Sequence, residues 1–344
     1  MDRPNILFFR HPEAPKPALP VRPVFLPGAG CPGRCLYCAQ EVQTGRSAVV
    51  LGEMYDALRR DLEAAAASDG APFEIAFFGG TFTSLPGNYA RRFVSLAGEF
   101  KARGPVAAVR CSTRPDAADG PLLRDLAALG LDTVELGVQT FDDKALAASR
   151  RGYAGATARA ACAAVRAAGL GLGVQLLPGL PGHTPDAFRR DVEITLDVTP
   201  DCLRLYPCLV IEGSVLAAMF ERGAYAPWEL ETAASEIARA LPPLWRAGVR
   251  LARIGLAPQP ELLHGIKAGP WHASLGSLAR GRALLAMLTR LLDGRRLASI
   301  RLPRRYQGEF FGHGGELAPA YESLGLARHN VTIWDEPHFA LETA

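Results

Sequence analysis

Short apolar runs alternate with alanine-rich stretches between residues 22 and 257 of the chain. The runs are rich in β-branched and aromatic residues, as strands are, and the stretches between them carry apolar residues at spacings of three and four, as amphipathic helices do. Strands are predicted at residues 22–27, 73–79, 106–112, 132–138, 171–177 and 201–207. Helices are predicted at residues 53–67, 87–102, 119–129, 142–168 (interrupted at Gly152 and Gly155), 184–197 and 214–243 (broken near Pro227).

These six strand–helix units in a row predict a parallel sheet with helices outside it. The chemically distinctive residues follow the ends of the strands, as they do in a barrel whose functional loops lie at the carboxyl ends of its strands. We therefore predict an α/β fold, a partial (β/α)6 TIM-like barrel over residues 22–257. A seventh apolar run, at residues 248–257, either closes the sheet or begins a second subdomain.

The two ends of the chain lack this pattern. Five prolines between Pro12 and Pro23 predict an extended, proline-rich arm over residues 1–21. Beyond residue 258 the pattern loosens into loops, with a helix expected at 275–293 and a short strand at 330–334. Residues 258–344 are therefore expected to form a small C-terminal α+β extension, a candidate substrate-binding subdomain.

Composition and charge exclude little. The chain has 38 basic and 35 acidic residues and a formal net charge of +3, which neither favours nor excludes an acidic partner. Its first residues lack the pattern of a secretory signal, and its most apolar stretch, residues 167–182, is interrupted by glycines and two prolines, so no membrane span is expected. A cytoplasmic enzyme is expected, and in the cytoplasm clustered cysteines hold metal more often than they form disulfides.

Three of the seven cysteines lie within eight residues, at Cys31, Cys35 and Cys38. Three thiolates at this spacing can surround one soft metal centre. A structural zinc ion needs four ligands, and no fourth lies nearby in the sequence. A [4Fe–4S] cluster normally takes four cysteines, so three would leave one iron open to a ligand from elsewhere. A zinc-stabilised binding module is the alternative of another class. The other four cysteines have no metal-like spacing and are expected in the core: Cys111, Cys162, Cys202 and Cys208.

The Cys-x-x-x-Cys-x-x-Cys spacing resembles the signature of the radical S-adenosylmethionine (SAM) superfamily. The resemblance implies that the open iron of a [4Fe–4S] cluster binds SAM, and that an electron from the cluster cleaves SAM to methionine and a 5′-deoxyadenosyl radical. It implies that Tyr37 lies against the adenine. It also implies that the backbone of the FFGGTFT stretch, at Gly79, Gly80 and Thr81, meets the methionyl amine. Core packing for Tyr37 and a plain turn for the glycines are the alternatives.

Two further stretches, ELGVQTFDDKALAASRRGY (135–153) and GVQLLPGLPGHT (173–184), resemble the oxygen-independent coproporphyrinogen oxidases and the radical SAM part of the elongator catalytic subunit. The resemblance implies that Gln139 and Arg151 fix the ribose and the carboxylate of SAM, with Arg150 as the alternative arginine. It implies that Gln175 binds the ribose hydroxyls. CSTRPD (111–116) is similar to an elongator-type motif, which makes Arg114 a candidate for the cofactor or substrate pocket.

The resemblance covers roughly residues 20–255 and favours the elongator-like branch. Residues 258–344 are too few to hold the acetyltransferase domain of that subunit, so the chain is expected to lack one. Ala39 stands where the coproporphyrinogen enzymes carry a further cysteine, which disfavours the porphyrin alternative. The chemistry implies a reductant such as flavodoxin or ferredoxin.

The substrate remains open between a base of RNA and a small molecule such as a tetrapyrrole precursor. Eight arginines against one acid, Asp293, lie between residues 280 and 305, a stripe that could neutralise phosphates. The arginines expected to contact phosphate are Arg295, Arg296, Arg301, Arg304 and Arg305, and the aromatic residues expected to stack on bases are Trp271, Tyr306, Phe310 and Phe311. For a small molecule, the expected pocket wall is the loop 268–276, which contains Trp271 and His272, together with Arg204 and Tyr206.

Overall fold

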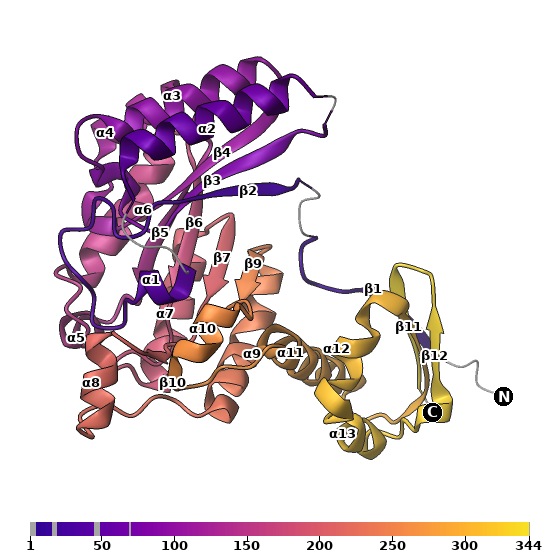
Figure 1. Cartoon of the computed structure of the whole chain (residues 1–344). Coiled ribbons are helices and arrows are strands. Elements are labelled where there is room, and N and C mark those ends of the chain that lie inside the picture. Colours follow the sequence, from indigo (N-terminus) through magenta and orange to yellow (C-terminus); the bar gives the residue numbers. More distant parts are fainter. Residues whose placement is uncertain (1–4, 16–18, 45–48, 69, 344) are drawn as a thin grey trace.

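The computed structural model describes residues 5–15, 19–44, 49–68 and 70–343. Its main feature is a curled sheet of seven parallel strands in the order β2-β3-β4-β5-β6-β7-β9, with helices on its outside (Figure 1). The strands are β2 Val21–Phe25, β3 Phe73–Phe78, β4 Val106–Thr113, β5 Thr133–Gln139, β6 Gly171–Leu176, β7 Cys202–Leu205 and β9 Arg250–Ile254. The partial barrel is confirmed.

The number of barrel strands is seven, where the prediction counted six. The apolar run at 248–257 supplies the extra strand, β9, which pairs in parallel with β7. Leu251 on β9 is fully buried, so the strand covers apolar side chains that would otherwise lie at an open edge. The choice left open by the sequence is therefore settled in favour of an extension of the sheet.

The helices around the sheet begin and end close to the predicted positions. They are α2 Leu51–Ala66, α3 Tyr89–Ala102, α4 Gly120–Ala128, α5 Asp143–Ala148, α6 Gly155–Ala167, α7 Pro185–Val198, α8 Val215–Glu221 and α9 Leu230–Arg246, with short α1 Gln40–Thr44. Side chains of Asp119, Asp142, Thr184 and Ser214 accept hydrogen bonds from backbone N–H groups in the first turns of α4, α5, α7 and α8. Such caps satisfy N–H groups that have no partner within the helix.

Helix α5 ends in a turn that orients a functional side chain. The N–H of Arg151 bonds to the carbonyl of Leu146 and the N–H of Arg150 to that of Ala147, which is the Schellman pattern of helix ends. Arg150 takes the left-handed conformation at φ 54°, a position usually held by glycine. The turn leaves Arg150 exposed and directs the buried Arg151 to the inside of the barrel.

A second hydrophobic core lies in a C-terminal lobe, around a four-stranded sheet of order β1-β13-β11-β12. Its strands are β1 Asn5–Arg10, β11 Leu297–Pro303, β12 Val331–Trp334 and β13 His338–Thr343. The start of the proline-rich arm is therefore a strand that pairs with the C-terminal end of the chain (Figure 1). The sequence predicted β12 but not β1, β11 or β13. The domain boundaries at residues 21 and 257 stay a prediction.

One long helix, α11 Leu275–Leu292, connects the two cores. Its first half contributes Leu275, Ala279 and Ala283 to the barrel core, and its second half contributes Leu284 and Leu288 to the core of the C-terminal lobe. The remaining elements are β8 Val210–Ile211, α10 Pro260–Gly265, β10 Ile266–Ala268, α12 Gln307–Phe311, α13 Ala318–Ser323 and the 3₁₀ turns η1 Phe82–Ser84, η2 Pro115–Ala117, η3 Arg304–Tyr306, η4 His313–Gly315 and η5 Arg328–Asn330. Within the described ranges, no helix has the length and apolar character needed to cross a membrane.

Candidate active site

A cavity of about 850 Å³ opens where the barrel strands end. All eleven residues predicted for the cofactor site line it: Cys31, Cys35, Tyr37, Cys38, Gly79, Gly80, Thr81, Arg114, Gln139, Arg151 and Gln175. Arg204 and Tyr206, which the sequence proposed for a pocket wall, line it as well. Residues from six strand ends therefore meet in one place, as the barrel fold predicts.

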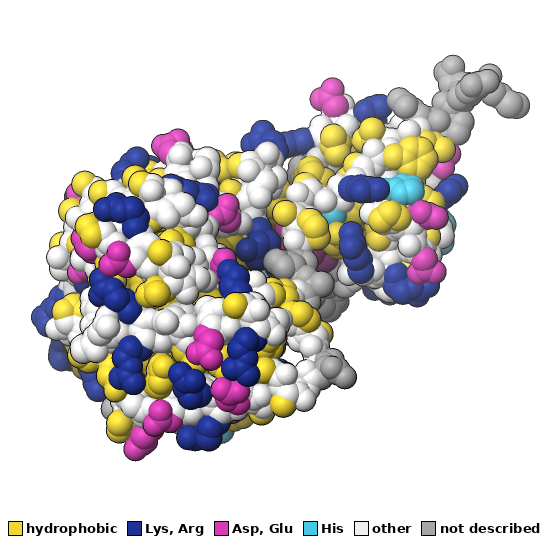
Figure 2. Space-filling view, turned by 90° about the horizontal axis from the view of Figure 1, so that it is seen from above, with side chains coloured by type: hydrophobic (Ala, Val, Ile, Leu, Met, Phe, Trp, Pro, Cys, Tyr) yellow, Lys and Arg dark blue, Asp and Glu magenta, His cyan; other side chains and the backbone are white. Residues whose placement is uncertain are grey.

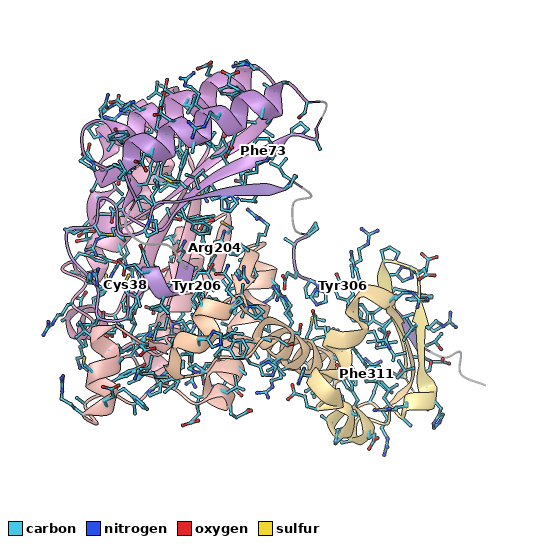
Figure 3. The ribbon with its side chains drawn as sticks, in the orientation of Figure 1. Cys38, Phe73, Arg204, Tyr206, Tyr306 and Phe311 are labelled. Atoms are coloured by element: carbon cyan, nitrogen blue, oxygen red, sulfur yellow. The ribbon has the colours of Figure 1, made fainter. Side chains whose placement is uncertain are left out.

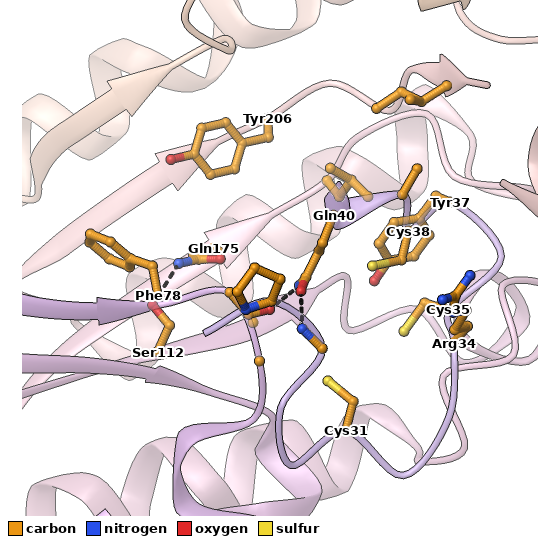
Figure 4. Close-up of a pocket in the computed structure, with 18 of the residues that line it drawn as sticks. Cys31, Arg34, Cys35, Tyr37, Cys38, Gln40, Phe78, Ser112, Gln175 and Tyr206 are labelled. Carbon is orange, nitrogen blue, oxygen red and sulfur yellow. Dashed lines mark hydrogen bonds between the residues drawn. The ribbon is translucent and has the colours of Figure 1, made fainter. Parts of the chain in front are cut away.

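The cysteine loop between β2 and α1 forms one wall of this cavity, and Figure 4 shows the sulfur atoms of Cys31, Cys35 and Cys38 pointing toward the open space. The side chain of Gln40 fastens the loop, because it accepts from the N–H of Gly28 at 2.5 Å and donates to the carbonyl of Gly79. Cys31 Sγ lies 3.2 Å from the hydroxyl of Thr81. The loop is thus held against the end of β3.

Gly79 and Gly80 have a structural reason that the sequence did not suggest. A Cβ at Gly80 would lie 1.9 Å from the carbonyl oxygen of Ala29, and one at Gly79 would lie 3.0 Å from the carbonyl carbon of Leu26. The glycines therefore allow the cysteine loop to approach the end of β3, whereas the prediction explained them by the approach of a ligand.

The donor atoms fit an iron–sulfur cluster. Burial, together with the neighbouring Cys35 and Cys31, raises the pKa of the Cys38 thiol to about 11. Three thiolates close together repel one another, and a cationic centre with soft-ligand preference removes that repulsion. No three His, Cys, Asp or Glu side chains of the described ranges converge as ligands of a single metal ion. The cysteines of a four-iron cluster bind different irons and do not need to converge on one point.

Two arginines face Cys35. Arg151 is 4% exposed and places Nη1 3.0 Å from Cys35 Sγ, while its Nη2 donates to the Gly137 carbonyl at 2.6 Å. Arg114 places Nη1 3.6 Å from the same sulfur but pairs with Asp116 through two hydrogen bonds of 2.9 and 2.7 Å.

Arg151 has no carboxylate partner within the described ranges, so the charge of its guanidinium is free to bind an anion. Burial disfavours the charged form, but Tyr37, Tyr153 and Cys35 outweigh burial and raise the pKa of Arg151 above its ordinary value. The alternative Arg150 is exposed and is absent from the cavity lining. The roles that the resemblance assigns to Arg151 and Arg114 in the cofactor or substrate pocket stay predictions.

Gln139 lies at the end of β5 in a strained conformation, with φ 68°. Non-glycine residues rarely adopt this left-handed region, and strain of this kind is concentrated at functional sites. A Cβ at Gly137 would lie 2.8 Å from the amide nitrogen of Gln139, so the glycine makes room for the glutamine side chain. The strained backbone thus holds the Gln139 amide in the cavity wall.

The hydroxyl of Tyr37 is a buried polar atom with no hydrogen-bond partner within the described ranges. Burial raises its pKa well above the ordinary value. The ring packs with Leu180 and Val210 under the cysteine loop, so core packing accounts for the ring but not for the hydroxyl. An unpaired buried hydroxyl is costly and suggests a partner that a ligand supplies.

A network of charged residues crosses the inside of the barrel. Glu135 is 1% exposed and accepts two hydrogen bonds from Arg204, at 2.7 and 3.1 Å, one from Arg110, and one from Gln175 at 3.0 Å. Arg110 also pairs with Glu74. Burial opposes ionisation of Glu135, but Arg204 and Arg110 outweigh it and lower the pKa of the carboxyl. Two carboxylates and two guanidinium groups thus balance in charge.

The sequence prediction overlooked Glu74, Arg110 and Glu135. A signal was present, because each is the single charged residue of a mainly apolar strand: FEIAFF, VAAVRCST and TVELGVQ. Such a residue in a buried parallel sheet must find a partner of opposite charge, and here the partners come from neighbouring strands.

The residues predicted to contact RNA do not form one surface. Phe310 is fully buried and stacks on Tyr321 at 4.0 Å between ring centres, and Tyr306 stacks on His11 at 4.4 Å, so neither lies open to a base. Tyr306 and Phe311 lie in the C-terminal lobe, far from Arg204, Tyr206 and Cys38 in the barrel (Figure 3). Trp271 and His272 are absent from the cavity lining.

The arginine stripe is divided as well. Arg280 pairs with Glu13, at 2.5 and 2.7 Å, and Arg282 pairs with Glu231 at 2.7 Å, so both serve as structural links near the join of the two cores. The other arginines of the stripe belong to the C-terminal lobe.

The four cysteines outside the triplet are all buried, as predicted: Cys111, Cys162, Cys202 and Cys208.

Comparison with known proteins identifies relatives that modify tRNA. The chain is 30% identical over 259 residues to a protein of Dehalococcoides mccartyi named tRNA uridine(34) acetyltransferase, covering 65% of this chain and 56% of the relative. It is 30% identical over 217 residues to the protein of the same name from Methanocaldococcus jannaschii, covering 56% of this chain and 40% of the relative. The chain thus spans only about half the length of these curated relatives.

Solved structures show the same fold. The Elp3 protein of Methanocaldococcus infernus, with residues 1–46 deleted, superimposes with a TM-score of 0.59 at 24% identity, over 80% of this chain and 64% of that one. The coproporphyrinogen III oxidase HemN of Escherichia coli, described as a radical SAM enzyme, gives a TM-score of 0.51 at 20% identity, over 70% of this chain and 54% of that one.

Two family models match the chain. The model of the radical SAM superfamily matches residues 25–194, which include the whole cysteine loop and β3 to β6, and that of the Radical_SAM C-terminal domain matches residues 200–283. Together the two ranges cover well over half of the chain. The chain therefore belongs to the radical SAM superfamily of enzymes, in its elongator-like branch, and its cofactors are a [4Fe–4S] cluster and SAM.

Proposed function

We propose that this chain is a radical SAM enzyme that modifies a base of RNA. The observation that carries the proposal is the cavity in which the three cysteines, the strained Gln139 and Arg151, which has no carboxylate partner in the described ranges, meet. The names of the relatives, which act on a uridine of tRNA, support RNA as the substrate class. Their acetyl transfer is not proposed for this chain.

The cofactors supply a carbon radical that abstracts a hydrogen atom, and the residues of the chain bind and orient. Cys31, Cys35 and Cys38 would hold the cluster. Arg151 would bind the carboxylate of SAM through Nη1, which lies beside Cys35 Sγ, because its Nε and Nη2 already donate to Tyr153 and Gly137 and no carboxylate of the described ranges competes. The close approach of Cys35 Sγ places that cation beside the cluster ligands.

Other residues would fix the nucleoside half of SAM. Gln139 and Gln175 offer amide groups to the ribose hydroxyls, and Gln175 is held in place by its bond to Glu135 at 3.0 Å. Tyr37 would lie against the adenine, and Arg114, fixed by Asp116, would border the cofactor or substrate. Gly79, Gly80 and Thr81 would present their backbone to the amine of SAM.

The far wall of the cavity would receive the substrate. It carries Arg204, whose Nη1 donates to the hydroxyl of Tyr206 at 3.1 Å, and the exposed Arg253. Arg204 is held by Glu135 and Tyr206 and lies over the Phe78 ring at 5.4 Å, so its position is fixed and its charge is balanced. A flat guanidinium beside a tyrosine ring is suited to a planar heterocycle such as a nucleobase.

The test begins with protein purified without air. It should bind about four irons and four sulfides per chain and, with a reductant such as flavodoxin or ferredoxin in the cytoplasmic setting that we propose, release 5′-deoxyadenosine slowly from SAM. Bulk tRNA should accelerate the release. Acceleration by a tetrapyrrole precursor instead would assign a small-molecule substrate. One zinc per chain without sulfide would leave a zinc-stabilised binding module.

A further inference from the structure

The sheet of the C-terminal lobe has one covered and one open face. Phe9, Ile300, Leu302, Phe339 and Leu341 point into the core formed with α11 and α12. The alternate positions of the four strands form the opposite side, which we name the outer sheet face. The strand register places these residues on it: Ile6, Phe8 and Arg10 of β1, His338, Ala340 and Glu342 of β13, Ser299, Arg301 and Pro303 of β11, and Thr332 and Trp334 of β12. On this face Phe8, Arg10 and Arg301 are exposed, whereas the small side chains Ala340 and Pro303 are buried.

Three aromatic rings from three strands form a row across the outer sheet face. Phe8 meets His338 edge to face at 5.4 Å, and His338 meets Trp334 edge to face at 4.8 Å. The side chain of Phe8 is 59% exposed, and among the large apolar residues of the described ranges only Val50 is more exposed. In each of these pairs the edge of one ring covers a face of the other, and His338 and Trp334 are half-buried, so the open ring surface is mainly that of the exposed Phe8.

Arginines accompany this row of rings. The guanidinium of Arg301 lies 5.6 Å from the centre of the Trp334 ring, and the register puts Arg10 beside His338. Neither arginine has a carboxylate partner in the described ranges. The acids nearby are engaged or lie at the ends: Asp335 pairs with Arg304 at 3.0 Å, and Glu342 accepts from Ser299 at 2.8 Å.

The exposed Glu336 is the remaining acid, in the turn that follows Trp334, and Arg305 follows the parallel strand β11 at the same end of the sheet. Figure 2 shows basic, acidic, histidine and hydrophobic side chains intermixed on one side of this lobe. A mixture of open rings and unpaired arginines differs from an apolar interface, which would exclude the charges.

We propose that the outer sheet face binds single-stranded RNA, with bases stacked on Phe8 and Trp334 and phosphates held by Arg10 and Arg301. The inference rests on the proposed function and extends it to a site outside the cavity. A sheet face with aromatic rings and arginines is suited to unpaired bases, because every base offers a flat surface and the backbone offers charge. A duplex hides its bases and would leave the rings unused.

This assignment replaces the aromatic residues expected from the sequence. Phe310 lies in the core and Tyr306 stacks on His11, while Phe8 and Trp334 come from the two ends of the chain and each contact His338. Of the five arginines expected to contact phosphate, the proposal retains Arg301 as the central one.

The experiment measures binding of a labelled uridine-rich single strand of about 12 nucleotides to the full chain, by fluorescence anisotropy at two salt concentrations. Phe8→Ala should weaken binding about tenfold. Arg301→Gln should weaken binding and lower the slope of log affinity against log salt by about one. Leu291→Ala and Arg290→Gln, on the exposed side of α11, are matched controls and should bind as the unaltered chain does.

A hairpin of the same composition should bind more weakly than the single strand. Equal binding by Phe8→Ala, Arg301→Gln and the unaltered chain would overturn the assignment of this face. In that case RNA-stimulated release of 5′-deoxyadenosine, measured in parallel on the same variants, shows whether the proposed function stands without it. A change of oligomeric state in Phe8→Ala with unchanged RNA affinity would also overturn it, since it would assign β1 to pairing with a second copy.

Discussion

Replacing Glu135 by glutamine should destabilise the barrel, because the carboxylate is the centre of the buried charge network. It accepts hydrogen bonds from Arg110, Arg204 and Gln175 and is 1% exposed. Glutamine has nearly the same shape but no charge. Arg110 keeps its pairing with Glu74, so Arg204 is the cation left without a counter-charge.

The cost follows from the bonds that are lost. Arg204 makes two hydrogen bonds to the carboxylate, at 2.7 and 3.1 Å, and one to Tyr206 at 3.1 Å. A hydrogen bond to a charged group contributes about 1.5–3 kcal/mol, and removing one partner of a buried ion pair costs about 3–5 kcal/mol. The glutamine oxygen retains part of the bonding, so we expect a loss near 3 kcal/mol.

Urea unfolding of the cluster-free protein, followed by far-ultraviolet circular dichroism, measures this loss as a lower midpoint. The double variant Glu135→Gln/Arg204→Gln also removes the stranded cation. It should therefore be more stable than the sum of the two single changes predicts, by about 2 kcal/mol. Glu63→Gln, which breaks the exposed pair with Arg103, is the matched control and should leave the midpoint unchanged.

The pH dependence gives a second measure. The pKa of Glu135 is lowered on folding, so its contribution is complete above the pKa of the unfolded carboxyl and is lost as the pH falls through the folded value. The difference between the unaltered chain and Glu135→Gln should therefore be constant from neutral pH upward and shrink in acid. A single variant that loses less than about 1 kcal/mol, or strictly additive variants, would refute the network as a stabilising unit.

Three further changes address the cofactor site. Cys35→Ala should abolish binding of iron and labile sulfide, whereas Cys162→Ala, in the buried core, should retain both. Metal and sulfide analysis measures the difference. Retention of the cluster by Cys35→Ala would remove that cysteine from the ligand set. Arg151→Ala should weaken SAM binding by about ten- to a hundredfold, as measured by calorimetry, and Arg150→Ala is the matched control. Equal losses of affinity in the two variants would show that the side chain facing the cavity is not the one that binds SAM. Gly80→Ala should displace the cysteine loop and reduce the iron content, since its Cβ would lie 1.9 Å from the Ala29 carbonyl oxygen. Gly33→Ala is the control and should keep the iron content, because no atom lies within 4 Å of a Cβ there. Normal iron content in Gly80→Ala would mean that the loop can shift without losing the cluster.

Much of the candidate site could be predicted because its chemistry is local in the chain. The cysteine triplet lies in one loop, and the other predicted residues follow the ends of strands whose apolar pattern is clear. A parallel barrel brings all its strand ends to one side, so assigning the strands was enough to assemble Cys35, Gly80, Gln139 and Gln175 around one cavity. The role of each residue there stays a prediction.

The choice between neighbouring side chains was beyond the sequence. Arg150 and Arg151 are identical in type and adjacent, and only the left-handed turn at the end of α5 exposes one and buries the other. The same holds for Glu135, whose charge could be read in its strand but whose partners depend on which strands lie beside it and in which register.

By itself, the sequence determined the alternation of strands and helices, the cysteine loop and the family resemblance, since each depends on residues close together in the chain. Tertiary structure alone decided that the run at 250–254 joins the sheet, and that residues 5–10 pair with residues 338–343. Pairing between distant strands depends on matching edges and on which face each strand buries, and neither is encoded by local periodicity. The outer sheet face, with Phe8 and Trp334 brought together from the two ends of the chain, exists only because of that pairing.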